Sequence, residues 1–228
     1  MRRLGATRGT LALSAVGATV SSTAVTAALA RQLVRPESPA IVLDAGIAIA
    51  SAVMFVRTLV LTAVLVPLAL RTLAMVIGPG AVVATGFGLW ALRRSDRVTA
   101  PVELPISNPF DLRPALAMAA IVAVMSLATR WATIRYGDSG IAVVLAITGA
   151  MDVDSAIITM RGLPHGTLDA RVAGLILALP ILLNTLVKAG LTVALGGWRR
   201  GSRASLPLLA SIAASLLALV AIYSGNYE

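Results

Sequence analysis

The chain has 228 residues, of which 58% are hydrophobic and only 13% are charged. Soluble domains carry about 25% charged residues, so this composition excludes an ordinary soluble protein and indicates an integral membrane protein. The net charge is +9, but the arginines lie mostly between apolar runs, as loop charges of membrane proteins do, which argues against nucleic-acid binding. The absence of cysteine excludes disulfides and thiolate metal sites.

A helix that spans a bilayer needs about 20 mostly apolar residues. The stretches that meet this requirement are, in chain order, 11–30, 41–66, 72–92, 114–133, 140–160, 171–195 and 205–223. The breaks between them combine charge with Gly, Pro or Ser, which is turn chemistry. The sequence therefore predicts an all-α, polytopic membrane helix bundle of about seven transmembrane helices, forming one integral membrane domain over residues 1–228. Basic residues are almost balanced between the two sides, so the membrane orientation stays open.

Two Gly-led segments resemble each other within the chain. "GATVSSTAVTAAL" at 17–29 aligns with "GAMDVDSAIITMR" at 149–161, at an offset of 132 residues, and Arg57 falls near Lys188 at almost the same offset. Small and β-branched residues align easily in membrane helices, so chance is the alternative. We favour a repeat, because the residues that coincide include the rare polar ones.

The repeat predicts an architecture of two related halves. We expect three-helix units at 11–92 and 140–223, with the helix at 114–133 between them and the linker 93–113 at the membrane surface. A cleaved signal peptide is an alternative interpretation of the basic and then apolar N-terminus. The repeat favours retention of that segment.

A family resemblance covers nearly the whole chain. The stretches that carry it are "SSTAVTAALA" at 21–30, "ASAVMFVRTLVL" at 50–61, "NPFDLRPAL" at 108–116, "TGAMDVDSAI" at 148–157 and "NTLVKAGL" at 184–191. They resemble the MgtC/SapB-associated membrane proteins described as domain of unknown function 4010. The resemblance implies membrane residence and a link to ion homeostasis, and it supplies no demonstrated chemistry.

Two acids interrupt the apolar segment at 140–160. A carboxylate inside a bilayer costs several kcal/mol, so Asp152 and Asp154 need a partner, a proton or an ion. On a regular helix they would point about 200° apart, but Gly149 allows the helix to unwind, and both acids, with Ser155 beside them, could then line one cavity. The alternative places both acids at a wetted helix end.

Ser21, Ser22 and Thr23 occupy the matching place in the first half. Hydroxyls at a broken helix can bind an ion together with free backbone groups. The alternative is that they bond back to the preceding turn or join neighbouring helices.

Two basic residues lie inside apolar runs. Arg57 and Lys188 are expected to pair with the acids or to contact an anionic solute, and Asn184 lies one helical turn before Lys188 on the same face. Snorkelling to the interface is the alternative. Asp44, near the start of its helix, is expected to face solvent.

These residues predict transport of an ion or small charged solute, at a site where 17–24 and 149–156 approach each other near the midplane. The alternative is a non-transporting regulatory or assembly subunit. No enzyme activity and no cofactor are expected, since "GDSG" at 137–140 lacks the partners of a protease and His165 is alone. The expected partners are the lipid bilayer of the plasma or inner membrane, the solute, and a further copy or an MgtC/SapB-like membrane protein.

Overall fold

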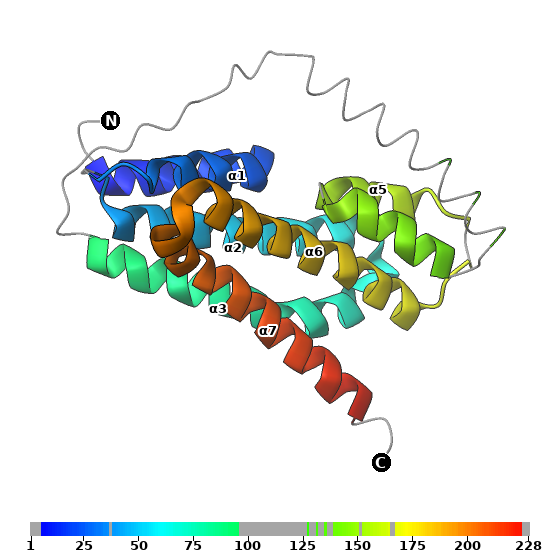
Figure 1. Cartoon of the computed structure of the whole chain (residues 1–228). Coiled ribbons are helices and arrows are strands. Elements are labelled where there is room, and N and C mark those ends of the chain that lie inside the picture. The colour runs from blue at the N-terminus through cyan, green and yellow to red at the C-terminus, as the bar shows by residue number, and fades with distance from the viewer. Residues whose placement is uncertain are drawn as a thin grey trace. The chain divides into compact units, whose positions relative to one another are not determined.

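A computed structural model describes residues 6–36, 38–95, 127, 131, 135, 139–150, 152–164 and 167–224. Within these ranges the chain forms helices and turns and no strand (Figure 1). The elements are α1 (Ala6–Gln32), α2 (Ala40–Leu65), the 3-10 turn η1 (Pro67–Ala69), α3 (Leu70–Ser95), an apolar helix over Ser139–Ala150, α5 (Val153–Arg161), α6 (Ala170–Gly196), the π-helical turn η2 (Gly197–Gly201) and α7 (Ser202–Ser224).

In the described part of the chain, four stretches are long and apolar enough to cross a membrane. They are Gly9–Gln32, Ala40–Leu65, Pro67–Arg94 and Ala170–Ile222. Large apolar side chains face outward along them, such as Val20, Val64 and Val82, which are 83%, 73% and 72% exposed. A soluble protein buries such residues, whereas lipid accommodates them. The chain is therefore an all-helical, multi-pass membrane protein.

The helix boundaries follow the hydropathy prediction closely where both are described. The last stretch, of 53 residues, contains both α6 and α7, which were predicted as two segments. The predicted helix at 114–133, most of the linker 93–113, and His165 lie outside the described residues, apart from isolated positions. The total of about seven spans thus stays a prediction.

The turn between α6 and α7 depends on glycine. Gly197 has a φ of +76°, a backbone conformation that other L-residues rarely adopt. Gly201 packs so closely that a β-carbon there would overlap the carbonyl oxygen of Thr192 and lie 2.8 Å from Cα of Val193. Arg200 donates hydrogen bonds to the carbonyl oxygens of Leu33 and Arg35, at 3.0 and 2.9 Å. These contacts fix the chain reversal at the end of α6.

Contacts between residues divide the chain into two compact units. Among the described residues, unit 1 consists of those within Met1–Arg57, Gly78–Ile106 and Thr185–Glu228, and unit 2 of those within Thr58–Ile77 and Ser107–Asn184. Each unit is described by itself below.

Unit 1 has a core of buried aliphatic side chains from α1, α2 and α7. Leu29, Leu33, Leu43, Ile47 and Leu208 belong to this cluster, and none of them is exposed except through the outer apolar surface. Small residues let helices approach closely in the same unit, since a β-carbon at Gly80 of α3 would lie 2.7 Å from the carbonyl oxygen of Ser211 in α7. This packing of small residues is typical of helices in a membrane.

Candidate functional site

Helix α1 is broken in its middle at Ser21. This residue has φ −151° and ψ 100°, an extended conformation between two helical pieces. Its Oγ accepts a hydrogen bond from the backbone N–H of Ala24 at 3.2 Å, so Ser21 acts as the N-cap of the second piece. A helix end leaves backbone groups without partners inside the helix, and this break therefore presents them in the middle of a candidate span.

Arg57 of α2 binds the carbonyl groups that the break leaves. Its Nη1 donates to the carbonyl oxygen of Thr19 at 2.6 Å and to that of Val20 at 3.3 Å. These oxygens carry the partial negative charge of a helix C-terminus, which a guanidinium group complements. Arg57 thus stabilises the end of the first piece of α1.

Lys188 of α6 contacts the beginning of the second piece. Its Nζ donates to Oγ of Ser22 at 2.8 Å. Lys188 is 0% exposed and Ser22 is 4% exposed, so the ammonium group does not reach the surface of the protein as a snorkelling lysine would. Two cationic side chains from two helices therefore meet the same break, all within unit 1.

A second break, in unit 2, separates the helix over Ser139–Ala150 from α5. Asp152 has φ −149° and ψ 111°, and its Oδ2 accepts hydrogen bonds from the backbone N–H and the hydroxyl of Ser155, at 3.1 and 2.5 Å. Asp152 is the N-cap of α5, and Asp154 lies half-buried in the first turn. Carboxylates at this end of a helix are stabilised by its N–H groups and its dipole.

Asn184 of α6 binds the carbonyl group at the second break. Its Nδ2 donates to the carbonyl oxygen of Ala150 at 2.9 Å. Gly149 is still helical, and a β-carbon on it would overlap that of Pro180 and lie 3.1 Å from that of Ala156. The prediction that Gly149 itself unwinds the helix is wrong. This glycine allows close packing, and the break begins after Ala150.

The two breaks share their local geometry. Both have an extended residue that caps the next helical piece through a hydrogen bond to the N–H three residues later, Ser21 in one and Asp152 in the other. In both, a side chain from the helix that follows donates to the carbonyl oxygen two residues before the cap, namely Thr19 and Ala150. The charges differ, because Arg57 and Lys188 contact the first break whereas the second contains two carboxylates.

The role of Asp152 as a cap predicts a difference between two substitutions. Asp152→Ser keeps an oxygen that can accept from the N–H of Ser155, whereas Asp152→Ala removes it. We expect Asp152→Ala to be less stable than Asp152→Ser by about 1 kcal/mol, a typical value for an N-cap. Thermal unfolding of the purified protein in detergent measures this, and equal melting temperatures of the two variants would contradict the assignment.

Sequence reasoning found the polar side chains but missed their partners. The carbonyl groups of Thr19 and Ala150 carry no signal in the sequence, since every residue has a carbonyl. The capping oxygens did carry one, because Ser and Asp are preferred N-cap residues. Thr23 is half-buried beside the first break. Among the described residues no three His, Cys, Asp or Glu side chains gather in a way that could hold a metal ion.

The expectation for Asp44 is wrong. Instead of facing solvent it is half-buried in unit 1, with its Oδ1 enclosed and without a hydrogen-bond partner. Arg203, at the start of α7, interacts with it electrostatically. Helix α2 thus carries a second enclosed charged residue besides Arg57.

Comparisons with known proteins place these features in a family. The family model described as "Domain of unknown function (DUF4010)" matches residues 1–196, which include both breaks. An uncharacterized protein of Aquifex aeolicus (strain VF5) is 28% identical over 95 residues, a match that covers 41% of this chain and 41% of the relative's length. No solved structure matches the chain.

Proposed function

We propose that this chain, which belongs to the DUF4010 family, transports an ion or small charged solute across a membrane, with the two broken helices supplying the polar groups. What supports the proposal is the break at Ser21, in the middle of the candidate span Gly9–Gln32. Irregular backbone at membrane depth is tolerated only where protein covers it or where it lines a watery cavity. Discontinuous helices of this kind form the ion and substrate sites of many transporters.

Helix α6 adds support, because it contributes a donor to each break. Asn184 bonds to the carbonyl oxygen of Ala150, and Lys188, one helical turn later, bonds to Ser22. Asp152, Asp154 and Ser155 are the proposed cation or proton ligands of the second break. The expectation that 17–24 and 149–156 face each other stays a prediction.

We further propose that the two halves are copies of one ancestral unit. Asp152 follows Ser21 by 131 residues, and Lys188 follows Arg57 by the same number. The helices agree, since the start and end of α6 and the start of α7 follow those of α2 and α3 by 131 residues to within one residue. The shared cap geometry supports this register, which is one residue shorter than the offset that the glycines suggested.

Flux through proteoliposomes tests the proposed function. The purified chain is reconstituted and assayed with gradients of protons, Na⁺, K⁺, Mg²⁺, chloride and phosphate, against protein-free liposomes. We expect flux of at least one of them and a decrease of about tenfold or more in Asp154→Asn, because a neutral amide loses the charge that compensates a dehydrated cation. Asp169→Asn is the control, since Asp169 caps α6 through its Oδ1, and asparagine keeps that function.

Two outcomes would refute transport at this site. One is the absence of flux above protein-free liposomes for every gradient, and the other is equal flux of wild type and Asp154→Asn.

A non-transporting regulatory or assembly subunit is the second candidate. The observation that favours it is that the polar side chains at the breaks bond directly to protein groups, Arg57 and Asn184 to carbonyl oxygens and Lys188 to a hydroxyl. Such bonds join membrane helices without any solute. The proposed partners are a further copy of the chain or an MgtC/SapB-like membrane protein. We propose no enzyme activity in either case, and residence in the plasma or inner membrane.

A further inference from the structure

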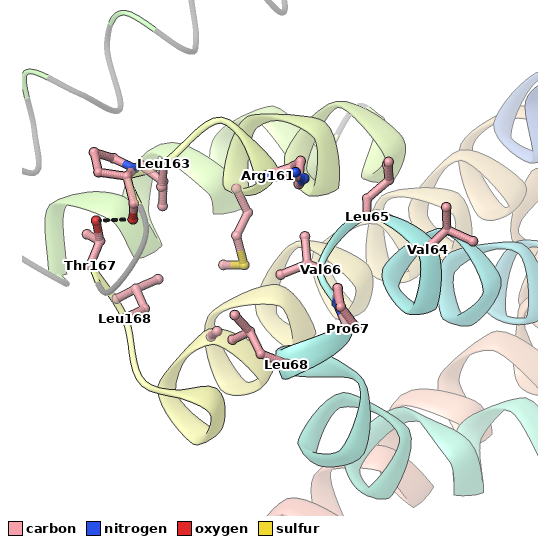
Figure 2. Close-up of a pocket in the computed structure, with 12 residues that line it drawn as sticks. Val64, Leu65, Val66, Pro67, Leu68, Arg161, Leu163, Thr167 and Leu168 are labelled. Atoms are coloured by element: carbon pink, nitrogen blue, oxygen red, sulfur yellow. Dashed lines mark hydrogen bonds between the residues drawn. The ribbon is translucent and has the colours of Figure 1, made fainter.

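Unit 2 contains a cavity of about 380 Å³, away from both breaks (Figure 2). One wall is the turn Val64–Leu68 between α2 and α3, and the other consists of residues between Met160 and Ala173, at the end of α5 and the start of α6. Cavities that hold small ligands typically have volumes of about 300 to 1,000 Å³ and mostly apolar walls. The volume and the lining both meet this description.

The lining is apolar except at one end. Valine, leucine, methionine, proline and alanine side chains form most of it, and Arg161 is its charged member. Thr167 is less available to a ligand, because its hydroxyl donates to the carbonyl oxygen of Pro164 at 2.6 Å (Figure 2). Arg161 is exposed in the last turn of α5. The cavity therefore suits a molecule with an apolar body and one anionic group.

Both walls lie where the chain leaves the apolar layer. The turn at Val66 separates the candidate spans Ala40–Leu65 and Pro67–Arg94, and the other wall precedes and enters the span that begins at Ala170. Such positions lie at the depth of the lipid headgroups.

The rim of the cavity adds positive charge. Arg71 and Arg171 are exposed three residues after Leu68 and Leu168, which line it. The nearby acid, Asp169, is engaged, since its Oδ1 accepts from the backbone N–H groups of Arg171 and Val172, at 2.7 and 3.0 Å. Basic pockets between membrane helices attract anionic headgroups.

We propose that this cavity binds one anionic phospholipid of the bilayer, with an acyl chain between the two turns and the phosphate at Arg161. The charge of the rim selects an anionic over a zwitterionic headgroup. The apolar lining selects a lipid over a soluble anion such as inorganic phosphate. This site stands independently of the proposed transport, because it shares none of the residues at the breaks.

Lipid binding to the purified full chain tests the proposal. Native mass spectrometry in a neutral detergent counts adducts of dioleoyl phosphatidylglycerol and of dioleoyl phosphatidylcholine, which have identical chains. We expect phosphatidylglycerol to bind with a dissociation constant at least about fivefold lower, the difference that one arginine near an anionic surface typically makes. Inorganic phosphate at the same concentration should not compete.

Variants locate the site. Arg161→Gln should remove most of the preference for phosphatidylglycerol, and Leu168→Trp should weaken the binding of both lipids by filling the cavity. Arg31→Gln is the matched control, since Arg31 is likewise an exposed arginine in the last turn of a helix, α1. Equal binding of the two lipids, or equal effects of Arg161→Gln and Arg31→Gln, would overturn the proposal. Both arginines are exposed, so these two variants decide the matter even if Leu168→Trp fails to fold.

Discussion

Replacing Lys188 by methionine is expected to reduce solute flux by at least about tenfold in proteoliposomes. Methionine has a similar length but no charge, so the variant loses the ammonium group that Ser22 accepts at 2.8 Å. A buried charge inside a membrane protein is costly to keep and is most often found where it serves an ion or substrate path. Circular dichroism and gel filtration establish that the variant is folded before its flux is compared.

A double substitution separates a shared role from two independent ones. If Lys188 acts through its contact with Ser22, then Ser22→Ala combined with Lys188→Met should transport no worse than Lys188→Met alone. Gly190→Ala in the same helix is the control, because a β-carbon there meets no atom within 4 Å. Wild-type flux in Lys188→Met, or additive losses in the double variant, would contradict this role.

A single methyl group at Gly149 is expected to destabilise the protein by about 2 kcal/mol. The added β-carbon would overlap that of Pro180, which is part of a rigid ring, and it would crowd Ala156. Overpacking of this kind typically costs about 1 to 3 kcal/mol. In a chain of this length the melting temperature should fall by about 4 to 8 °C, measured by thermal unfolding in detergent.

Gly190→Ala is again the matched control for this experiment. It should leave the melting temperature unchanged or raise it slightly, since alanine favours a helix over glycine by up to about 1 kcal/mol. A similar loss in both variants would show that flexibility at glycine, rather than the contact with Pro180, is what matters.

The sequence was sufficient for the long helices, because their length is set by the bilayer. The predicted 41–66 and 171–195 differ from α2 and α6 by only one residue at either end. Hydropathy alone cannot divide such stretches into units, which depend on contacts between residues far apart in the chain. The chain reversal at Gly197–Gly201 was indicated by its Gly and Arg residues, but its π-helical geometry was not.

The breaks show what limited the prediction of the site. A break was correctly expected in both Gly-led segments, but its position was taken from glycine, whereas capping oxygens determine it, at Ser21 and Asp152. The long-range partners could not be predicted, since no local rule says that Arg57 reaches the carbonyl oxygen of Thr19 or that Lys188 reaches Ser22. The repeat hinted at such an arrangement only through matching polar positions.

The enclosure of Lys188 has a practical consequence. It is the only lysine among 19 basic residues, so the chain carries one side-chain amine, and that amine is shielded in the folded state. Acylating reagents can therefore modify Nζ only when the packing around it opens, and the extent of modification measures how often that happens. The native sequence thus contains its own chemical reporter of opening at the first break, with no engineered label required.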